Sequence, residues 1–359
     1  MYNHNYVNIF SKIAWDYGLL KKELLALVKH EFNESKNIEI TKELEAKPTT
    51  LYLMQYSPEG CQANCAFCVQ GLSSTKEKKT SYLVANQLIR FPVNTFKSFL
   101  KHNDHLFKRI CIQTILHSNT FDDLVYLIGE LRSATSLPIS ANCVPLNKKN
   151  IKKLHDIGLD RIVINYELAT PNLFDNIRGK NRNSPYSWEQ TTQALDDSLE
   201  IFGVNRVLSH LIVGIGETDY EALKHVRHLY KKGIIPSLFA FRPLEGTDLE
   251  NFSRISHSRF HCIQMATYFL KNGLTDLKNM KFDDAGNLVN PGVAQDLIRN
   301  TIYDGKCFMT SGCPWCNRPN YTVDPGERHY TYPQVPHIND LTVIEQEISN
   351  RWNLTPAER

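Results

Sequence analysis

The sequence predicts an α/β fold in which parallel strands alternate with helices and close into a TIM-like barrel. Three observations predict it. From residue 50 onward, short apolar and β-branched runs alternate with segments of helical apolar spacing. At least six such pairs follow one another, and a series of βα units favours a parallel barrel. A cysteine cluster directly follows the first predicted strand, at the end of the strands where barrels carry their chemistry.

The composition fits one large domain with appended segments. The chain has 359 residues, 42% of them hydrophobic, so it can bury a sizeable core. The net charge is only +3, from 41 basic and 38 acidic residues. This small excess of positive charge would not attract nucleic acid or an anionic membrane. No apolar run approaches the roughly 20 residues that span a bilayer. We therefore expect a soluble, cytoplasmic protein with no nucleic-acid partner and no membrane partner.

The predicted elements fall into three parts. Residues 1–48 form an N-terminal helical extension, because leucines such as Leu20 and Leu24 recur at helical spacing. Residues 49–275 form the barrel core, and residues 276–359 form a C-terminal segment that completes the barrel and binds a second metal centre. The predicted core strands are residues 51–56, 109–116, 137–144, 161–168, 204–214 and 236–243.

Helical patterns fill the segments between these strands. Leu124, Leu127 and Leu131 recur at helical spacing, and Gly233 follows another such segment as a helix stop. Past residue 275 the alternation weakens. Residues 307–310 are the remaining candidate for a final strand.

Cys61, Cys65 and Cys68 stand on one loop with the spacing C-x3-C-x-F-C, in which Phe67 precedes the last cysteine. Three thiolates on a short loop can hold three irons of a cubane 4Fe–4S cluster and leave the fourth iron without a protein ligand. A structural zinc knuckle is the alternative, but zinc sites usually take paired cysteine arms with a second pair nearby. The next histidine, His117, lies a whole βα unit away, so the spacing favours an iron–sulfur cluster.

This motif, its place after the first strand and the barrel pattern resemble the radical S-adenosylmethionine (SAM) superfamily. The resemblance implies that the open iron binds SAM and that one electron breaks its sulfonium bond, which produces a 5′-deoxyadenosyl radical. It also implies that Cys61, Cys65 and Cys68 are the catalytic cluster ligands and that Phe67 contributes to cofactor binding.

Two later strand ends resemble the biotin-synthase branch of this superfamily. Residues 211–218 resemble its V-G-x-G-E-T element, although a glycine pair alone often makes only a turn. The fourth predicted strand ends where relatives place an Asn and an acidic residue against the ribose of SAM. Most relatives have Asp there, so Glu167 is a departure, and a plain surface turn is the alternative. The implied cofactor-binding residues are Asn165, Glu167, Gly214, Gly216 and Glu217.

A second cysteine motif lies near the C-terminus. Cys307, Cys313 and Cys316 have the spacing C-x5-C-x2-C and are the candidate ligands of an auxiliary iron–sulfur cluster, expected to be of the 4Fe–4S type. Half of a zinc ribbon is the alternative. Three cysteines leave one ligand open, which Ser311 or Arg318 could supply from the same loop.

Three further cysteines are not assigned to a site. Cys111 and Cys143 fall close to positions where biotin synthase ligates its auxiliary cluster, but Leu208 replaces the third position, with His210 two residues on. Lone barrel cysteines are more often small buried hydrophobic residues than ligands. Cys111, Cys143 and Cys262 are therefore left unassigned, as either core residues or ligands.

The C-terminal run S-G-C-P-W-C-N-R-P, residues 311–319, together with this barrel resembles the archaeal-type lipoyl synthases, which work as a pair of related radical enzymes. The resemblance implies sulfur insertion at C6 or C8 of an octanoyl chain that is amide-linked to a carrier lysine, with sulfide from the auxiliary cluster. The implied partners are an octanoylated lipoyl-carrier domain or protein, a second related radical SAM enzyme and a low-potential electron donor. Two alternatives stay open: another biotin-synthase-like reaction, either sulfur insertion or methylation of a small molecule, and a non-enzymatic metal-stabilised binding module.

Overall fold

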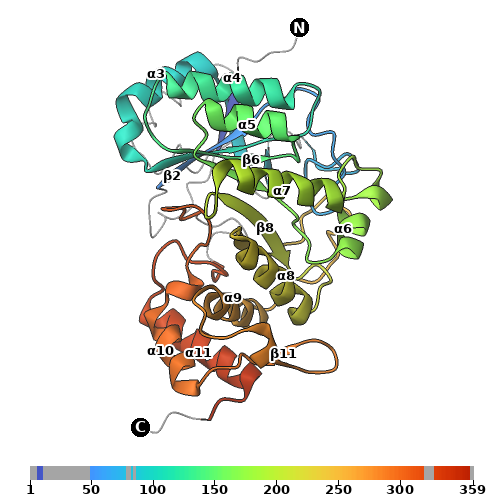
Figure 1. Cartoon of the computed structure of the whole chain (residues 1–359), viewed down its shortest axis with the longest axis vertical. Helices are drawn as coiled ribbons and strands as arrows, with labels where there is room; N and C mark the ends of the chain where they lie inside the picture. Colours follow the sequence, from blue (N-terminus) through green and yellow to red (C-terminus); the bar gives the residue numbers. More distant parts are fainter. Residues whose placement is uncertain (1–5, 11–48, 78–81, 84–85, 319–326, 356–359) are drawn as a thin grey trace.

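The computed structural model describes residues 6–10, 49–77, 82–83, 86–318 and 327–355. Six parallel strands form its centre, and they are β2 (Thr50–Gln55), β5 (Arg109–Gln113), β6 (Ile139–Cys143), β7 (Arg161–Ile164), β8 (Val207–Val213) and β9 (Ile235–Ala240). Each pairs in parallel with the next, so the strands curve into the wall of a partial barrel (Figure 1). All six predicted strands are present, and the predicted α/β barrel fold is confirmed in this partial form.

Helices cover the outer face of this wall. They are α3 (Val93–Asn103), α4 (Thr120–Arg132), α5 (Lys148–Asp156), α7 (Trp188–Phe202) and α8 (Asp219–Lys232) (Figure 1). The short helix α6 (Pro171–Ile177) lies at the carboxyl end of the strands, beside the loop that follows β2. Successive residues of a strand point to opposite faces. Along β5, Ile110 and Ile112 are completely buried in the core beneath the helices, whereas Cys111 and Gln113 line the interior cavity.

Three strands extend the sheet beyond β2. β1 (Tyr6–Phe10) pairs antiparallel with both β2 and β4 (Asn86–Pro92), and β3 (Tyr82–Leu83) forms the edge. The sheet order is therefore β3-β4-β1-β2-β5-β6-β7-β8-β9. The helical prediction for residues 1–48 is wrong at residues 6–10, because the aromatic and β-branched run Y-V-N-I-F favours a strand and finds a partner at the β2 edge. Residues 11–48 lie outside the described residues.

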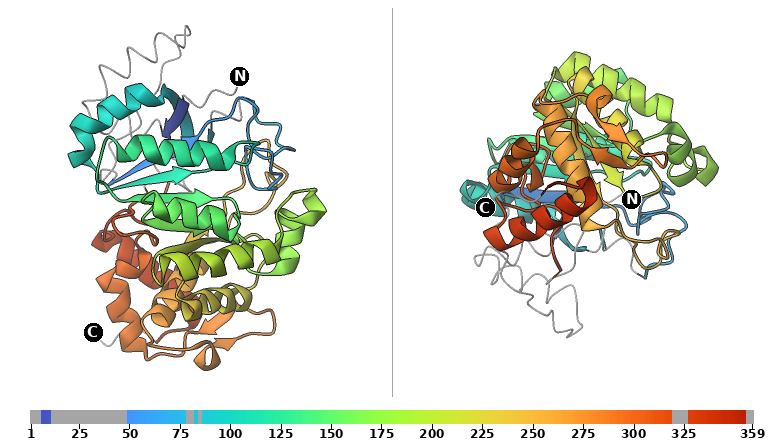
Figure 2. Two further views of the ribbon diagram at one scale, coloured as in Figure 1. Left: turned by 45° about the horizontal axis from the view of Figure 1, so that its top comes forward. Right: turned by 90° about the horizontal axis from the view of Figure 1, so that it is seen from below.

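The C-terminal part packs as a second cluster beside the barrel. It contains α9 (His257–Lys271), the hairpin of β10 (Lys281–Phe282) and β11 (Leu288–Asn290), α10 (Gln295–Asp304) and α11 (Ile338–Trp352), which gather around one apolar core (Figure 2). Within the described ranges, no helix is long and apolar enough to cross a membrane.

The strand predicted at residues 307–310 is not formed. Gly305 ends α10 in the left-handed region at φ 70°, and Lys306–Phe308 then make one 3-10 turn. Met309 forms only an isolated bridge to Tyr332. The chain therefore turns at the end of α10, and residues 307–310 do not pair with the sheet as a strand.

Candidate active site in the barrel cavity

A cavity of about 260 Å³ lies inside the barrel, and cysteines from both predicted motifs line it. Its mouth is at the carboxyl ends of the parallel strands, and its base is at their amino ends. We call Cys61, Cys65 and Cys68 the mouth set, because their loop follows the carboxyl end of β2. Between mouth and base the wall is largely apolar and includes Met54, Val163, Leu208, Ile212 and Phe239.

Backbone hydrogen bonds shape the loop that carries the mouth set. The Cys68 amide donates to the Cys65 carbonyl at 3.0 Å, and the Gly71 amide donates to the Cys68 carbonyl at 2.9 Å. Gly71 packs so closely that a Cβ there would lie 2.9 Å from the Cys65 carbonyl oxygen. A side chain at this position would therefore displace the cysteine loop. The Ala66 amide ties the loop to the end of α6 by donating to Ile177 at 2.8 Å.

Burial dominates the electrostatics of the mouth set. It raises the pKa of the Cys65 thiol, with Cys68 and Cys61 adding to the rise and the Arg178 guanidinium opposing it. It raises the pKa of Cys68 to about 12. The Arg178 side chain is itself buried, donates to the Asn165 carbonyl at 2.6 Å and lies 4.6 Å above the Tyr186 ring. A fixed positive charge thus stands next to the mouth set.

Asn165 and Glu167 line the cavity where β7 ends, so the structure brings both to the site. The Asn165 amide donates to the Asn142 side chain at 2.9 Å and to the Glu167 carboxylate at 2.8 Å. Glu167 adopts φ 64°, and its backbone forms a bridge to Leu211 on β8. Burial raises the pKa of Glu167, while Arg178 and the Asn165 hydrogen bond oppose this.

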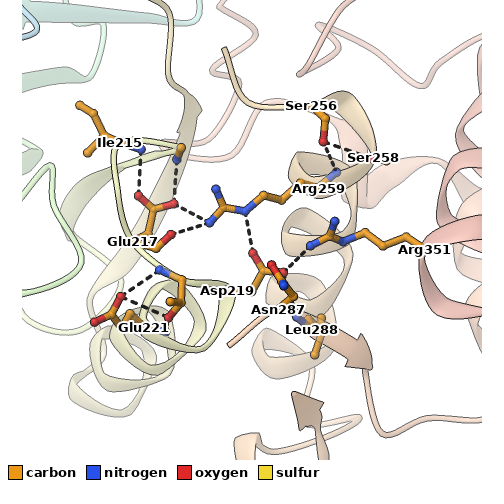
Figure 3. Close-up of polar contacts among 12 residues, drawn as sticks. Ile215, Glu217, Asp219, Glu221, Ser256, Ser258, Arg259, Asn287, Leu288 and Arg351 are labelled. Carbon is orange, nitrogen blue, oxygen red and sulfur yellow. Dashed lines mark hydrogen bonds and ion pairs between the residues drawn. The ribbon is translucent and has the colours of Figure 1, made fainter. Parts of the chain in front are cut away.

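Gly214, Gly216 and Glu217 do not line the cavity. The Glu217 carboxylate instead accepts hydrogen bonds from the Gly214 and Ile215 amides at 2.7 and 3.0 Å (Figure 3). Gly214 has φ 105°, and a Cβ there would lie 2.7 Å from Ile255. These residues therefore build the turn between β8 and α8, and their contact with the cofactor stays a prediction.

The same turn belongs to a buried ion network (Figure 3). Arg259 on α9 donates to Glu217 at 3.0 Å and to Asp219 at 2.7 Å, and Arg351 on α11 donates to Asp219 at 2.8 Å. Asp219 is fully buried. The network joins the barrel to the C-terminal helices.

At the base of the cavity the structure brings Cys313 and Cys316 together with Cys111, and we call these three residues the base set. All line the cavity, and the charges of Cys313 and Cys316 both act on Cys111, where burial is the main cause of its raised pKa. The segment that carries Cys313 and Cys316 docks on the amino ends of the strands. There the Asn317 side chain accepts from the Thr49 amide and hydroxyl, both at 2.9 Å.

Cys307 is not part of this group. It is buried among the C-terminal helices, with its thiol 3.9 Å from the Thr301 carbonyl of α10. The predicted trio of Cys307, Cys313 and Cys316 is therefore not assembled. The helix end at Gly305 points Cys307 into the C-terminal core before the chain reaches the barrel.

Comparison with known proteins identifies the family. A model described as the radical SAM superfamily matches residues 56–229, which include the mouth set and, after β7, Asn165 and Glu167. The chain therefore contains a radical SAM region at residues 56–229, which is just under half of its length. Radical SAM proteins use a 4Fe–4S cluster and SAM. Biotin synthase from Thermotoga neapolitana is 28% identical over 204 residues, which cover 54% of this chain and 66% of that protein.

Other comparisons give more distant matches. Biotin synthase from Clostridium botulinum (strain Hall) is 24% identical over 207 residues, which cover 55% of this chain and 59% of that protein. The matched region thus spans 59% to 66% of the length of these two relatives. Among solved structures, methylornithine synthase is 15% identical and superposes with a TM-score of 0.49, covering 86% of this chain and 83% of that one.

The mouth set fits the 4Fe–4S cluster of a radical SAM protein. Its three thiols share one loop and one cavity wall, and each acts on the charge of a neighbour. Metal binding would hold these buried thiols as thiolates, which burial alone disfavours. No three His, Cys, Asp or Glu side chains among the described residues meet closely enough for a single metal ion. A cubane cluster is wider, because its ligands are spread over several irons.

Sequence reasoning did not place three polar residues on the wall of this cavity. Arg178 and Arg318 both line it, and so does His210, whose pKa is held well below its ordinary value by burial and by these two arginines. From the sequence, Arg318 is predicted only as a candidate fourth ligand of the auxiliary cluster. Alternation along β8 could have placed His210 on the inner face, whereas no local pattern distinguishes Arg178.

Proposed function

We propose that this protein is a radical SAM sulfurtransferase that replaces C–H bonds of a protein-bound octanoyl chain with C–S bonds, as one of a pair of related lipoyl synthases. The observation that carries the proposal is the single cavity with cysteines at both ends and apolar walls between them. A saturated chain has no acidic C–H bond for a side-chain base, so a cofactor must supply the reactive species. An apolar wall suits such a chain.

The residues of the mouth take distinct roles in this proposal. Cys61, Cys65 and Cys68 hold the cluster, and Phe67 lies on the cavity wall beside it. Asn165 and Glu167 are oriented by the hydrogen bond between their side chains, which presents polar groups for the hydroxyls and ammonium group of SAM. Arg178 offsets the negative charge that the cluster and carboxylate bring into a buried site.

The two cofactors divide the chemistry. When bound, the mouth cluster would pass one electron from the low-potential donor to SAM, which would yield methionine and a 5′-deoxyadenosyl radical, and an auxiliary cluster would supply sulfide. For each new C–S bond, one C–H hydrogen would move to the deoxyadenosyl radical, and the electron left by C–S bond formation would be taken up by the auxiliary cluster. The chain's own contribution is to exclude water and to hold the octanoyl carbons in the apolar part of the cavity.

A biotin-type reaction is the second candidate. It would insert sulfur into a free small molecule by the same radical chemistry. The similarity to two biotin synthases favours it, although the identity is only 28% and 24%. The substrate distinguishes the two candidates, because only the first requires a carrier-bound acyl chain.

The test uses anaerobically reconstituted full-length protein with dithionite, SAM and an octanoyl-lysyl peptide, followed by mass spectrometry of nucleosides and peptide. We expect 5′-deoxyadenosine and a peptide that gains sulfur, and a single sulfur would indicate that a partner enzyme inserts the other. A parallel reaction with the sulfur-free precursor of biotin tests the second candidate. Deoxyadenosine with sulfur only in that precursor would contradict the octanoyl proposal, and no deoxyadenosine from cluster-loaded protein would contradict both.

A further inference from the structure

The position of Cys111 in the sheet is the starting observation. In the parallel register, Cys111 on β5 lies directly beside Tyr52 on β2 and Ser140 on β6. Neighbouring strands are about 4.8 Å apart, so these three residues form one continuous row across the inner wall. Cys111 occupies the centre of that row.

The two C-terminal cysteines contact the flanking members of the same row. The Cys316 sulfur lies 3.3 Å from the Tyr52 hydroxyl, and the Cys313 sulfur lies 3.3 Å from the Ser140 hydroxyl. Hydroxyl groups at this distance can donate to thiolates. Both C-terminal cysteines therefore contact the row whose centre is Cys111.

The C-terminal segment is fixed in this position by contacts that do not involve the cysteines. The Ser237 hydroxyl donates to the Ser311 carbonyl at 2.7 Å, and Arg318 donates to both of these residues at 3.2 Å. Arg318 also lies 3.9 Å from the Phe239 ring centroid. These contacts present Cys313 and Cys316 to the barrel interior.

Positive charges surround the base set. Arg109 is buried, forms an ion pair with Asp160 at 2.7 Å and acts on both Cys111 and Cys313. Arg161 acts on Cys313, and Arg318 acts on Cys111. Thiolates gathered in a buried site need such compensation.

We propose that Cys111, Cys313 and Cys316 hold a second iron–sulfur cluster at the base of the cavity, with Cys111 in the place that spacing alone would give to Cys307. The inference deepens the proposed function, because it identifies the residues that would hold its sulfide source. Tyr52 and Ser140 are positioning residues that donate to the thiolates. The mouth set and the base set then face the same apolar space from opposite ends.

The test compares Cys111→Ala with Cys307→Ala in the full chain reconstituted with ⁵⁷Fe. Both cysteines are largely shielded from solvent, but only Cys111 lines the cavity. Two 4Fe–4S clusters correspond to about eight irons per chain. We expect Cys111→Ala to lose about half of the iron and sulfide and one Mössbauer component, and Cys307→Ala to retain all of both. Cys143→Ala, at a cavity-lining cysteine outside the base set, should also retain them.

Cys316→Ala provides a second measurement in case Cys111→Ala fails to fold, and it should lose the same Mössbauer component. Iron loss in Cys307→Ala with full iron in Cys111→Ala would overturn the inference. The result is independent of the substrate: two loaded clusters without sulfur transfer to the octanoyl peptide would contradict the proposed function and leave the ligand assignment standing.

Discussion

The mouth set and the base set are built in different ways. The mouth set lies between residues 61 and 68 on one loop, which its own backbone hydrogen bonds and the close packing of Gly71 define. The base set joins Cys111 of β5 to the C-terminal segment, in which Cys313 lies 202 residues further along the chain. The first arrangement is local, whereas the second exists only when the C-terminal segment is docked. The two sets should therefore respond differently to substitution.

The largest expected effect comes from the mouth set. In Cys65→Ala, deoxyadenosine formation and sulfur insertion should both fall by more than about a hundredfold, because even outer partners of metal ligands contribute 10- to 100-fold. The base cluster should stay loaded, since no base-set residue depends on this loop. Chromatography of the nucleosides and iron analysis measure the two quantities. Loss of both clusters from a folded variant would show that the sets are not independent.

The next effect separates radical formation from sulfur transfer. In Cys313→Ala, sulfur insertion should fall by at least about tenfold, as expected when a metal centre is disturbed, while deoxyadenosine formation stays unchanged. Mass spectrometry of the peptide and of the nucleosides in one reaction measures both. Equal loss of the two products would contradict separate roles for mouth and base.

A third change tests whether iron content simply follows the free energy of unfolding of the whole protein. Arg259→Met breaks the buried pairs with Glu217 and Asp219 and should lower the free energy of unfolding by about 3 kcal/mol. Iron content should stay at the wild-type value, because the network touches neither cysteine set. Anaerobic denaturant unfolding followed by circular dichroism measures the stability.

Arg254→Met is the matched control for this change. Arg254 pairs with Glu327, and both side chains are about one-third exposed or more, at 32% and 39%. Exposed pairs contribute about 0–1 kcal/mol, so this variant should differ little from wild type. Equal destabilisation by the two arginine substitutions would contradict the importance given to the buried network.

The smallest expected effect concerns docking of the C-terminal segment. Asn317→Ala removes the hydrogen bond from the Thr49 amide, whereas the Thr49 hydroxyl can still donate to the Trp315 carbonyl. A net contribution of about 1 kcal/mol is lost, so the base cluster should lose iron to a chelator about fivefold faster. The mouth cluster should lose iron at its usual rate. Asn287→Ala, in the β10–β11 hairpin, is the control and should change neither rate. Faster iron loss from the mouth cluster alone would contradict the assignment of Asn317 to the docking of the base set.

The local features could be predicted from the sequence. The parallel strands are visible because their outer faces carry apolar residues, such as Ile110 and Ile112, that the helices bury. The mouth set is visible because its residues are close together in the chain. Alternation along β5 could also have placed Cys111 and Gln113 on the inner face. What alternation cannot supply is the path of the C-terminal segment, which decides that Cys111 meets Cys313 and Cys316.

One predicted grouping is not formed, and one predicted cofactor-binding side chain is engaged within its own turn, for related reasons. Cys307 is only six residues from Cys313, but the cap at Gly305 sends it into another core, so short spacing did not mean proximity. Glu217 matched a motif, yet its carboxylate is occupied by the Gly214 and Ile215 amides and by Arg259. In both cases a neighbouring backbone conformation, which residue types alone do not encode, determined the position of the side chain.

Mössbauer spectroscopy of ⁵⁷Fe-reconstituted protein, recorded with and without SAM, tests the central claim most directly. Two clusters in one cavity predict about eight irons per chain, of which one, the open iron of the mouth cluster next to Asn165 and Glu167, changes its signal when SAM binds. In the variant lacking Cys61, Cys65 and Cys68, a cluster should remain that does not respond to SAM. A triple variant without any cluster, or a remaining cluster that responds to SAM, would contradict the account.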